Sequence, residues 1–143
     1  IRRVEELSGH KIPFYQVDLL DLDGLRKVFA LDPDIQAVIH FAGLKAVGES
    51  VEKPLDYYRV NVGGTINLLE VMRERGVEHL IYSSSATVYG NPPSVPIWED
   101  FPLAPLSPYG RSKLACEQII QDVVGSSQLK ATILRYFNPA GAH

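Results

Sequence analysis

The chain has 143 residues, of which 45% are hydrophobic and 22% charged, a balance typical of a folded globular domain rather than a disordered chain. Its net charge of −3 and the absence of a Lys/Arg run argue against nucleic-acid binding and against an anionic membrane surface. No apolar run approaches the ~18 residues of a membrane span, and the single cysteine, Cys116, excludes an internal disulfide and favours a reducing compartment such as the cytoplasm.

Helical and strand patterns alternate regularly along the chain. Short apolar strands separated by helices are typical of βαβ units and of a parallel sheet covered on both faces, so we expect an α/β fold with a doubly wound parallel sheet. The long helix should carry its apolar stripe on Tyr58, Val62, Ile66, Leu69 and Met72. In chain order, the expected elements are a helix over residues 1–8, a strand over 14–19, a helix over 21–31, a strand over 37–42, a helix over 54–75, a strand over 79–83, a helix over 107–124 and a strand over 130–137.

Candidate site residues follow the strands, because ligands of doubly wound sheets bind beyond the carboxyl ends of the strands. Asp18 ends the first strand and could accept a hydrogen bond from an adenine amino group, or simply cap the next helix. The second strand runs into Ala42 and Gly43, whose small size lets a ligand approach the backbone. Lys45 could meet a phosphate or a ribose hydroxyl, although a solvated lysine explains it equally well.

Hydroxyl residues end the third strand, in the segment Ser83–Gly90, and could donate to a substrate oxygen or form only a polar turn. A proline-rich loop of roughly fifteen residues then leads to Ser107, and loops of that length are usually functional or mobile. After the last strand, Asn138 offers both donors and acceptors.

Tyr109 and Lys113 lie one turn apart on the next helix, for which Ser107 is the expected N-cap with Pro108 in the first position. An ammonium near a phenol favours the phenolate, which suits Tyr109 for proton transfer to and from a hydroxyl. Gly110 would leave the side of the helix open to a bulky ring. The spacing alone occurs by chance about 0.3 times in a chain of this composition, so its weight comes from its place after a strand that ends in serines.

Several other chemistries lack their motifs. Gly43 and Gly48 have the glycine spacing of a P-loop, but Glu49 replaces its lysine. The four histidines and Cys116 have no metal-ligand spacing, so no metal is expected and Cys116 is interpreted as a small buried hydrophobic residue. A G-x-G-x-x-G turn does not occur in the sequence.

Four segments together resemble the extended short-chain dehydrogenase/reductase family, and most closely its nucleotide-sugar epimerases. The resemblance covers essentially the whole chain. It implies a Rossmann-type NAD-binding domain whose glycine turn lies before Ile1 and whose C-terminal substrate region lies after His143. Residues 1–143 would then be an incomplete domain, inactive and poorly soluble by itself. The segments are His40–Ser50, Pro54–Tyr58, Ser83–Gly90 and Arg135–His143.

The resemblance also implies an activity: interconversion of UDP-galactose and UDP-glucose at C4, by hydride transfer to bound NAD, a 4-keto intermediate and hydride return to the opposite face. Related dehydratases carry a carboxylate after the serine, where this chain has Ala86 and Thr87, which cannot exchange a proton at neutral pH. Epimerases of UDP-N-acetylhexosamines or UDP-pentoses, and a non-catalytic NAD-binding module, stay open as alternatives.

Individual roles follow from the same resemblance. Tyr109 would be the base, Lys113 would bind the nicotinamide ribose, and Ser85 would hydrogen-bond the sugar 4-oxygen. A homodimer would form through the helices 54–75 and 107–124. The implied NAD contacts are Asp18, Leu19, Phe41, Ala42, Gly43, Lys45, Tyr109, Lys113 and Tyr136. The implied contacts to the UDP-sugar are Lys45, Ser85, Ala86, Thr87, Tyr109, Tyr136, Phe137 and Asn138.

Overall fold

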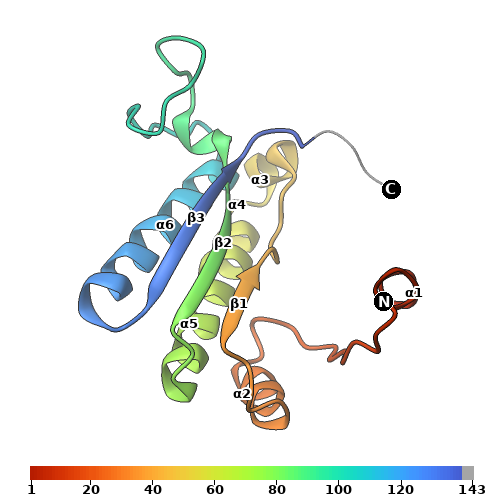
Figure 1. Ribbon diagram of the computed structural model, residues 1–143. Helices are drawn as coiled ribbons and strands as arrows, with labels where there is room; N and C mark the ends of the chain where they lie inside the picture. The colour runs from red at the N-terminus through yellow and green to blue at the C-terminus, as the bar shows by residue number, and fades with distance from the viewer. Residues whose placement is uncertain (140–143) are drawn as a thin grey trace.

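A parallel three-stranded sheet forms the centre of the computed structural model, which describes residues 1–139 (Figure 1). The strands are β1 (Ala37–His40), β2 (His79–Ser85) and β3 (Lys130–Tyr136), in the order β1-β2-β3. The β2–β3 register runs from His79 beside Lys130 to Ser85 beside Tyr136. The expected α/β class and parallel sheet are therefore confirmed.

Helices connect these strands. Helix α6 begins where the sequence predicts, because the Ser107 hydroxyl accepts a hydrogen bond from the Gly110 N–H at 3.1 Å and Pro108 fills the first position. A π-helical segment, η1 (Tyr58–Gly63), interrupts the long helix expected over 54–75, and a short 3₁₀ turn, η2 (Ala86–Tyr89), follows β2. The α-helices are α1 (Arg2–Ser8), α2 (Leu22–Leu31), α3 (Val47–Glu52), α4 (Pro54–Tyr57), α5 (Gly64–Arg75) and α6 (Pro108–Ser126).

Side-chain burial alternates along the strands. In β2, Leu80, Tyr82 and Ser84 are buried on the face covered by α5 and α6, whereas Ile81 on the other face is 36% exposed. Among residues 1–139, helices therefore cover one face of the sheet, and the expected covering of both faces is not found. Helix α1 buries none of its residues and lies apart from the sheet (Figure 1).

The strand expected over residues 14–19 is also absent. The segment has no regular secondary structure: the Asp21 N–H donates to the Asp18 carbonyl and the Leu20 N–H to the Asp18 side chain, both at 2.9 Å, and the Leu19 carbonyl accepts from the Asn67 side chain on α5 rather than from a strand. A strand is defined by ladder bonds to a neighbour, and in the described part of the chain β1 pairs only with β2. Alternating apolar residues were not sufficient here to predict a strand.

The apolar stripe of the long helix was predicted wrongly at Tyr58 and Ile66, whereas Val62 packs against the core as predicted. Tyr58 is 37% and Ile66 45% exposed, while Tyr57, Asn61 and Thr65 are buried. The wider turn of η1 shifts the helical phase relative to a regular 3.6-residue period. Leu69 and Met72 lie beyond η1 and are buried as predicted.

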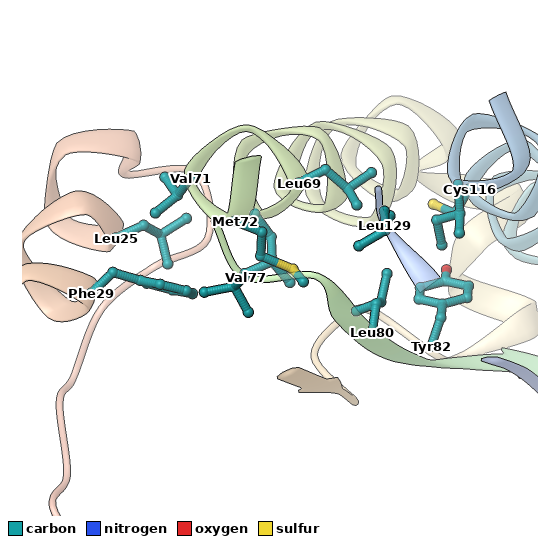
Figure 2. Packing of buried hydrophobic residues seen from close by; sticks show 12 residues of the cluster. Leu25, Phe29, Leu69, Val71, Met72, Val77, Leu80, Tyr82, Cys116 and Leu129 are labelled. Atoms are coloured by element: carbon teal, nitrogen blue, oxygen red, sulfur yellow. The ribbon is translucent and has the colours of Figure 1, made fainter. Parts of the chain in front are cut away.

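The hydrophobic core joins α2, α5, β2 and α6 (Figure 2). Phe29 packs toward Val77, and Tyr82 toward Cys116, which is fully buried as the sequence predicts. This core fixes α6 over β2 and thereby sets the position of the site residues at the start of α6. The buried members of the cluster are Leu25, Phe29, Leu68, Leu69, Val71, Met72, Val77, Leu80, Tyr82, Cys116, Ile120 and Leu129.

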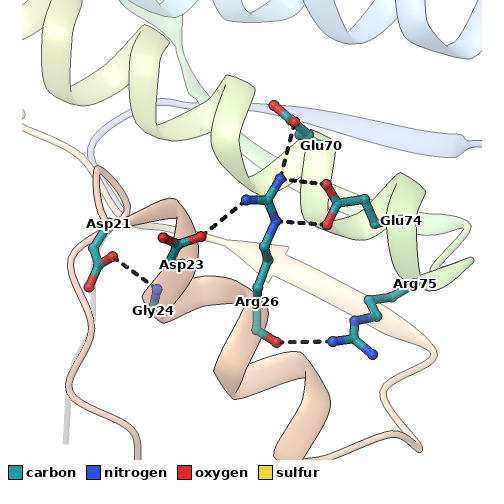
Figure 3. A network of polar contacts seen from close by, with 7 residues as sticks. All are labelled: Asp21, Asp23, Gly24, Arg26, Glu70, Glu74 and Arg75. Atoms are coloured by element: carbon teal, nitrogen blue, oxygen red, sulfur yellow. Dashed lines mark hydrogen bonds and ion pairs between the residues drawn. The ribbon is translucent and has the colours of Figure 1, made fainter.

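A polar network joins α2 to α5 at the surface (Figure 3). The Arg26 guanidinium donates to both carboxylate oxygens of Glu74, at 2.9 and 2.7 Å, and to Asp23 at 3.1 Å. Helix α5 also holds the turn before α2, since the Asn67 amide donates to the Leu19 carbonyl at 2.9 Å. The Asn67 bond therefore anchors the Asp18–Leu19 turn against α5, while the Arg26 network holds α2 against α5.

Gly90 ends η2 in a conformation that only glycine adopts easily, with φ of 63°. A Cβ there would lie 2.0 Å from the Ala104 carbonyl oxygen. We expect Gly90→Ala to lower the free energy of unfolding of the whole protein by at least about 2 kcal/mol, through strain and this clash. Urea unfolding followed by circular dichroism checks this. The control is Gly125→Ala in α6, which meets nothing within 4 Å. Equal midpoints for the two variants would contradict the expectation.

Candidate active site

The carboxyl ends of the strands and the start of α6 meet at one edge of the sheet. Tyr109 is 9% and Lys113 5% exposed, and Ser85 is the last residue of β2. Because β2 packs against α6, the predicted Tyr/Lys pair and the predicted serine belong to one region.

Lys113 is anchored to the end of β2. Its ammonium donates to the Ser83 carbonyl oxygen at 2.8 Å and lies 4.9 Å from the centre of the Tyr82 ring. Burial lowers the pKa of Lys113. A charged group held this firmly and this far from water can act on a neighbouring ligand with little loss of side-chain entropy.

The Tyr109 ring is held at its edge by a second tyrosine. Tyr57 lies with its ring centre 6.4 Å away at an interplanar angle of 81°. The Tyr57 hydroxyl is fixed in turn, 2.8 Å from the Ala46 carbonyl and 3.0 Å from the Glu49 carboxylate. Burial, followed by the hydrogen bond to Glu49, raises the pKa of Tyr57, so this phenol stays protonated beside Tyr109.

Ser85 and Thr87 form a small hydroxyl pair. The Thr87 hydroxyl and N–H both donate to the Ser85 Oγ, at 3.0 and 3.2 Å. Since Ser85 accepts both bonds, its own proton can be donated outward. Gly110 faces this pair: a Cβ on it would lie 3.0 Å from the Thr87 carbonyl oxygen and 3.0 Å from Pro105. The expectation that Gly110 leaves room for a bulky ring is therefore wrong, because its small size lets α6 pack against η2.

Asn61 is a site residue that sequence reasoning missed. It is buried in η1. Its side-chain amide donates to the Leu44 carbonyl at 3.1 Å and to the Ser112 hydroxyl at 3.0 Å, and its side-chain oxygen accepts from the Leu44 N–H at 2.8 Å. It thus fixes the loop after β1 against α6. A Cβ on Gly43 (φ 149°) would lie 2.8 Å from the Asn61 Oδ1 and 3.8 Å from the Lys113 ammonium. No local signal marked it, since Arg59, Thr65 and Asn67 are polar residues of the same helical stretch.

The remaining predicted residues lie on the exposed side of this edge. Phe41 is 64% exposed, and its ring centre lies 6.3 Å from that of Tyr136 at the end of β3. The Asp18 carboxylate accepts from Leu20, whereas Asp21 caps α2, so the capping interpretation of Asp18 is wrong. Leu19 lies against Gly64 at the start of α5. Also exposed are Ala42, Gly43, Lys45, Phe137 and Asn138, while Ala86 is half-buried.

His40 is buried at the end of β1. The Thr65 hydroxyl donates a hydrogen bond to the backbone carbonyl of Asn61 at 2.6 Å. The His40 Nε2 must therefore donate to the Thr65 oxygen, 3.1 Å away. Burial, with a smaller effect from the positive charge of Lys113, lowers the pKa of His40 from 6.5 to about 4. The imidazole is therefore neutral in the folded protein at neutral pH.

This pKa shift predicts acid sensitivity. Because unfolded His40 binds a proton more readily than folded His40, the stability is complete above pH 6.5 and falls as the pH drops toward 4. The slope should approach about 1.4 kcal/mol per pH unit. We expect His40→Gln to remove this component from urea midpoints measured between pH 7.5 and 4.5, with exposed His10→Gln as the control. An unchanged pH dependence in His40→Gln would contradict the assignment.

In the portion of the chain that the structure describes, no group of three His, Cys, Asp or Glu residues could hold a metal ion. None of the helices over residues 1–139 has both the length and the apolar character to cross a membrane. Residues 140–143, the last four of the segment Arg135–His143, lie outside the described residues.

The parallel sheet, the buried Tyr/Lys pair and the serine at a strand end define the class: a Rossmann-like α/β domain. The chain belongs to the NAD dependent epimerase/dehydratase family, whose family model matches residues 2–143. This confirms the family resemblance expected from the sequence.

Individual relatives share a name. The chain is 57% identical to UDP-glucose 4-epimerase of Yersinia pestis, over all of this chain and 43% of the relative. It is 53% identical to UDP-glucose 4-epimerase of Homo sapiens, over all of this chain and 41% of the relative. The structure of UDP-glucose 4-epimerase from Bifidobacterium longum in complex with NAD+ and UDP superimposes with a TM-score of 0.94 and 49% identity, over 99% of this chain and 43% of that one. The chain thus spans about two fifths of the length of these relatives.

Proposed function

We propose that the whole protein is a NAD-dependent epimerase that interconverts UDP-galactose and UDP-glucose at C4. Residues 1–143 are then part of its NAD-binding domain and supply its tyrosine, lysine and serine. The observation that carries the proposal is the buried Tyr109–Lys113 pair at the start of α6, with the Lys113 ammonium 2.8 Å from the carbonyl oxygen of Ser83, two residues before Ser85 in β2. The similarity of this chain to UDP-glucose 4-epimerases supports the choice of sugar.

The residues at this edge fit a dinucleotide. Gly43 leaves the backbone open beside the Lys113 ammonium, where a Cβ would crowd Asn61. Of the three N–H groups of Lys113, one is hydrogen-bonded within residues 1–139, to Ser83, and the others can serve ribose hydroxyls. Phe41 and Tyr136 offer exposed aromatic faces. We assign the adenine end to Asp18 and Leu19, the ribose and diphosphate to Phe41, Ala42, Gly43 and Lys45, and the nicotinamide end to Tyr109, Lys113 and Tyr136.

NAD, when bound, supplies the redox chemistry at C4 of the sugar. Tyr109 takes the proton of the 4-hydroxyl and later returns it. The Lys113 ammonium, one helical turn away, stabilises the negative charge that develops on the phenol oxygen. Ser85 donates its proton to the 4-oxygen, since its own oxygen already accepts from Thr87 at 3.0 and 3.2 Å. The proton is taken and given back, and C4 is oxidised and then reduced again, so the net reaction is an isomerisation.

The remaining substrate contacts fall to Lys45, Ala86, Tyr136, Phe137 and Asn138, on the same edge of the sheet. Neither Ala86 nor Thr87 carries a carboxyl group, so these positions provide no acid or base for an elimination. This favours epimerisation over dehydration.

A direct test incubates the whole purified protein separately with UDP-galactose and UDP-glucose. Both reactions should reach the same mixture. Conversion of UDP-N-acetylhexosamines or UDP-pentoses alone would keep the family chemistry but overturn the sugar assignment. Binding of NAD without turnover of any UDP-sugar would overturn the enzyme assignment.

We further propose a homodimer in which α5 and α6 pack against their copies. Ile66 is 45% exposed on α5, and a hollow of about 170 Å³ lies between the two helices. It is lined by Ile66, Leu69, Glu70, Arg73, Ile119 and Val123. Light scattering on the whole protein should give twice the monomer mass; a monomer at micromolar concentration would contradict this.

The buried single Cys116 also fits a reducing compartment, which we propose to be the cytoplasm.

A further inference from the structure

A buried carboxylate that the proposed chemistry does not use lies directly behind the site. Glu117 on α6 is 1% exposed. It accepts from the Ser84 hydroxyl, and it pairs with the Arg135 guanidinium, whose Nη2 lies 2.8 Å from Oε2 and whose Nε lies 3.1 Å from Oε1. A buried ion pair of this kind is weak evidence for stability, because desolvation offsets its attraction. Its place in the fold suggests a different role.

Glu117, Ser84 and Arg135 each lie close in sequence to a proposed site residue on the same helix or strand. Glu117 lies one helical turn beyond Lys113 and two beyond Tyr109, on the same side of α6. Ser84 directly precedes Ser85 in β2, and Arg135 directly precedes Tyr136 in β3. Successive strand residues point to opposite faces of a sheet, so Ser84 and Arg135 face α6 while their neighbours are presented on the other face.

Arg135 extends this contact to the long loop. Its Nη1 donates to the Tyr89 hydroxyl at 2.9 Å and to the Glu99 carbonyl at 3.2 Å, and its guanidinium lies 5.0 Å from the centre of the Tyr89 ring. The planar guanidinium thus contacts α6, η2 and the loop after Gly90 at once. A lysine could not reproduce this fork of donors.

We propose that Glu117 and Arg135 are positioning residues that fix α6 relative to β2 and β3, and thereby fix Tyr109 and Lys113 relative to Ser85 and Tyr136. The proposal rests on the proposed epimerase function. Its physical basis is that a displacement of about 1 Å between reacting groups can cost about 100-fold in rate. A network that joins three elements next to the reacting groups restricts such displacements.

The test measures kcat, KM, bound NAD and thermal midpoint for the whole protein and for Glu117→Gln. The amide keeps the shape and can still accept from Ser84, but it loses the charge that holds Arg135. We expect kcat to fall about 10- to 100-fold, with KM for UDP-galactose within about threefold and bound NAD unchanged. The matched control is Glu74→Gln, which weakens the Arg26 pair between α2 and α5 and should leave kcat unchanged.

Arg135→Lys is the second variant and keeps the charge without the fork. We expect an intermediate loss of kcat, and this variant decides the matter if Glu117→Gln fails to fold. A lower thermal midpoint with unchanged kcat in either variant would show a merely structural role and overturn the proposal. An inactive wild-type protein would instead overturn the proposed function, so the two failures are distinguishable.

Discussion

Tyr109→Phe is expected to lower the conversion of UDP-galactose to UDP-glucose by the whole protein about 10²- to 10⁴-fold, the usual contribution of a general acid–base. The phenylalanine ring can keep the edge contact with Tyr57, 6.4 Å between ring centres. The variant therefore loses the oxygen that exchanges the proton, but not its packing. Initial rates of UDP-glucose formation, with thermal midpoints beside them, measure both effects.

The matched control for this variant is Tyr58→Phe. Tyr58 is 37% exposed in η1, next in sequence to the tyrosine that supports Tyr109. It should keep wild-type rates. Full activity in Tyr109→Phe would show that another group exchanges the proton, and the assignment of the base would be wrong.

Lys113→Met is expected to reduce kcat at least about 100-fold while changing stability little. The variant removes the ammonium that we propose stabilises charge on Tyr109, an effect comparable with removing a preorganised charge-stabilising donor. For stability two effects oppose each other. Burial disfavours the ammonium, as its lowered pKa indicates, but its removal leaves the Ser83 carbonyl without its 2.8 Å partner, a cost of about 1–3 kcal/mol.

The measurement for Lys113→Met is a pair of numbers, kcat and the urea midpoint, taken on one preparation. Exposed Lys130→Met at the start of β3 is the control and should change neither. A collapse of the midpoint in step with kcat would assign Lys113 a structural role only.

Sequence reasoning placed the proposed catalytic pair at the start of α6 because its signals are local. Ser107, Pro108, Tyr109 and Lys113 are all within two turns, and helix capping and helical spacing place them without reference to the rest of the fold. The serine segment at the end of β2 was found for a related reason, since strand ends of parallel sheets share one edge.

The residues that hold these groups in place could not be predicted in this way. The Glu117–Arg135 pair joins residues 18 apart on a helix and a strand, and the Asn61–Ser112 bond joins residues 51 apart. Such contacts depend on how α6 packs over the sheet, which no local pattern specifies. The missed π-helical turn and the unpaired segment 14–19 have the same origin, because helical phase and strand pairing are both decided by tertiary neighbours.

One measurement tests the proposed function most directly. The whole wild-type protein is incubated with UDP-galactose, and the sugar is followed by proton nuclear magnetic resonance. We predict new anomeric signals of UDP-glucose that grow until a stable mixture of the two sugars is reached. A spectrum in which UDP-galactose stays unchanged, recorded on folded protein with bound NAD, would contradict the proposal that this site inverts C4 of a UDP-hexose.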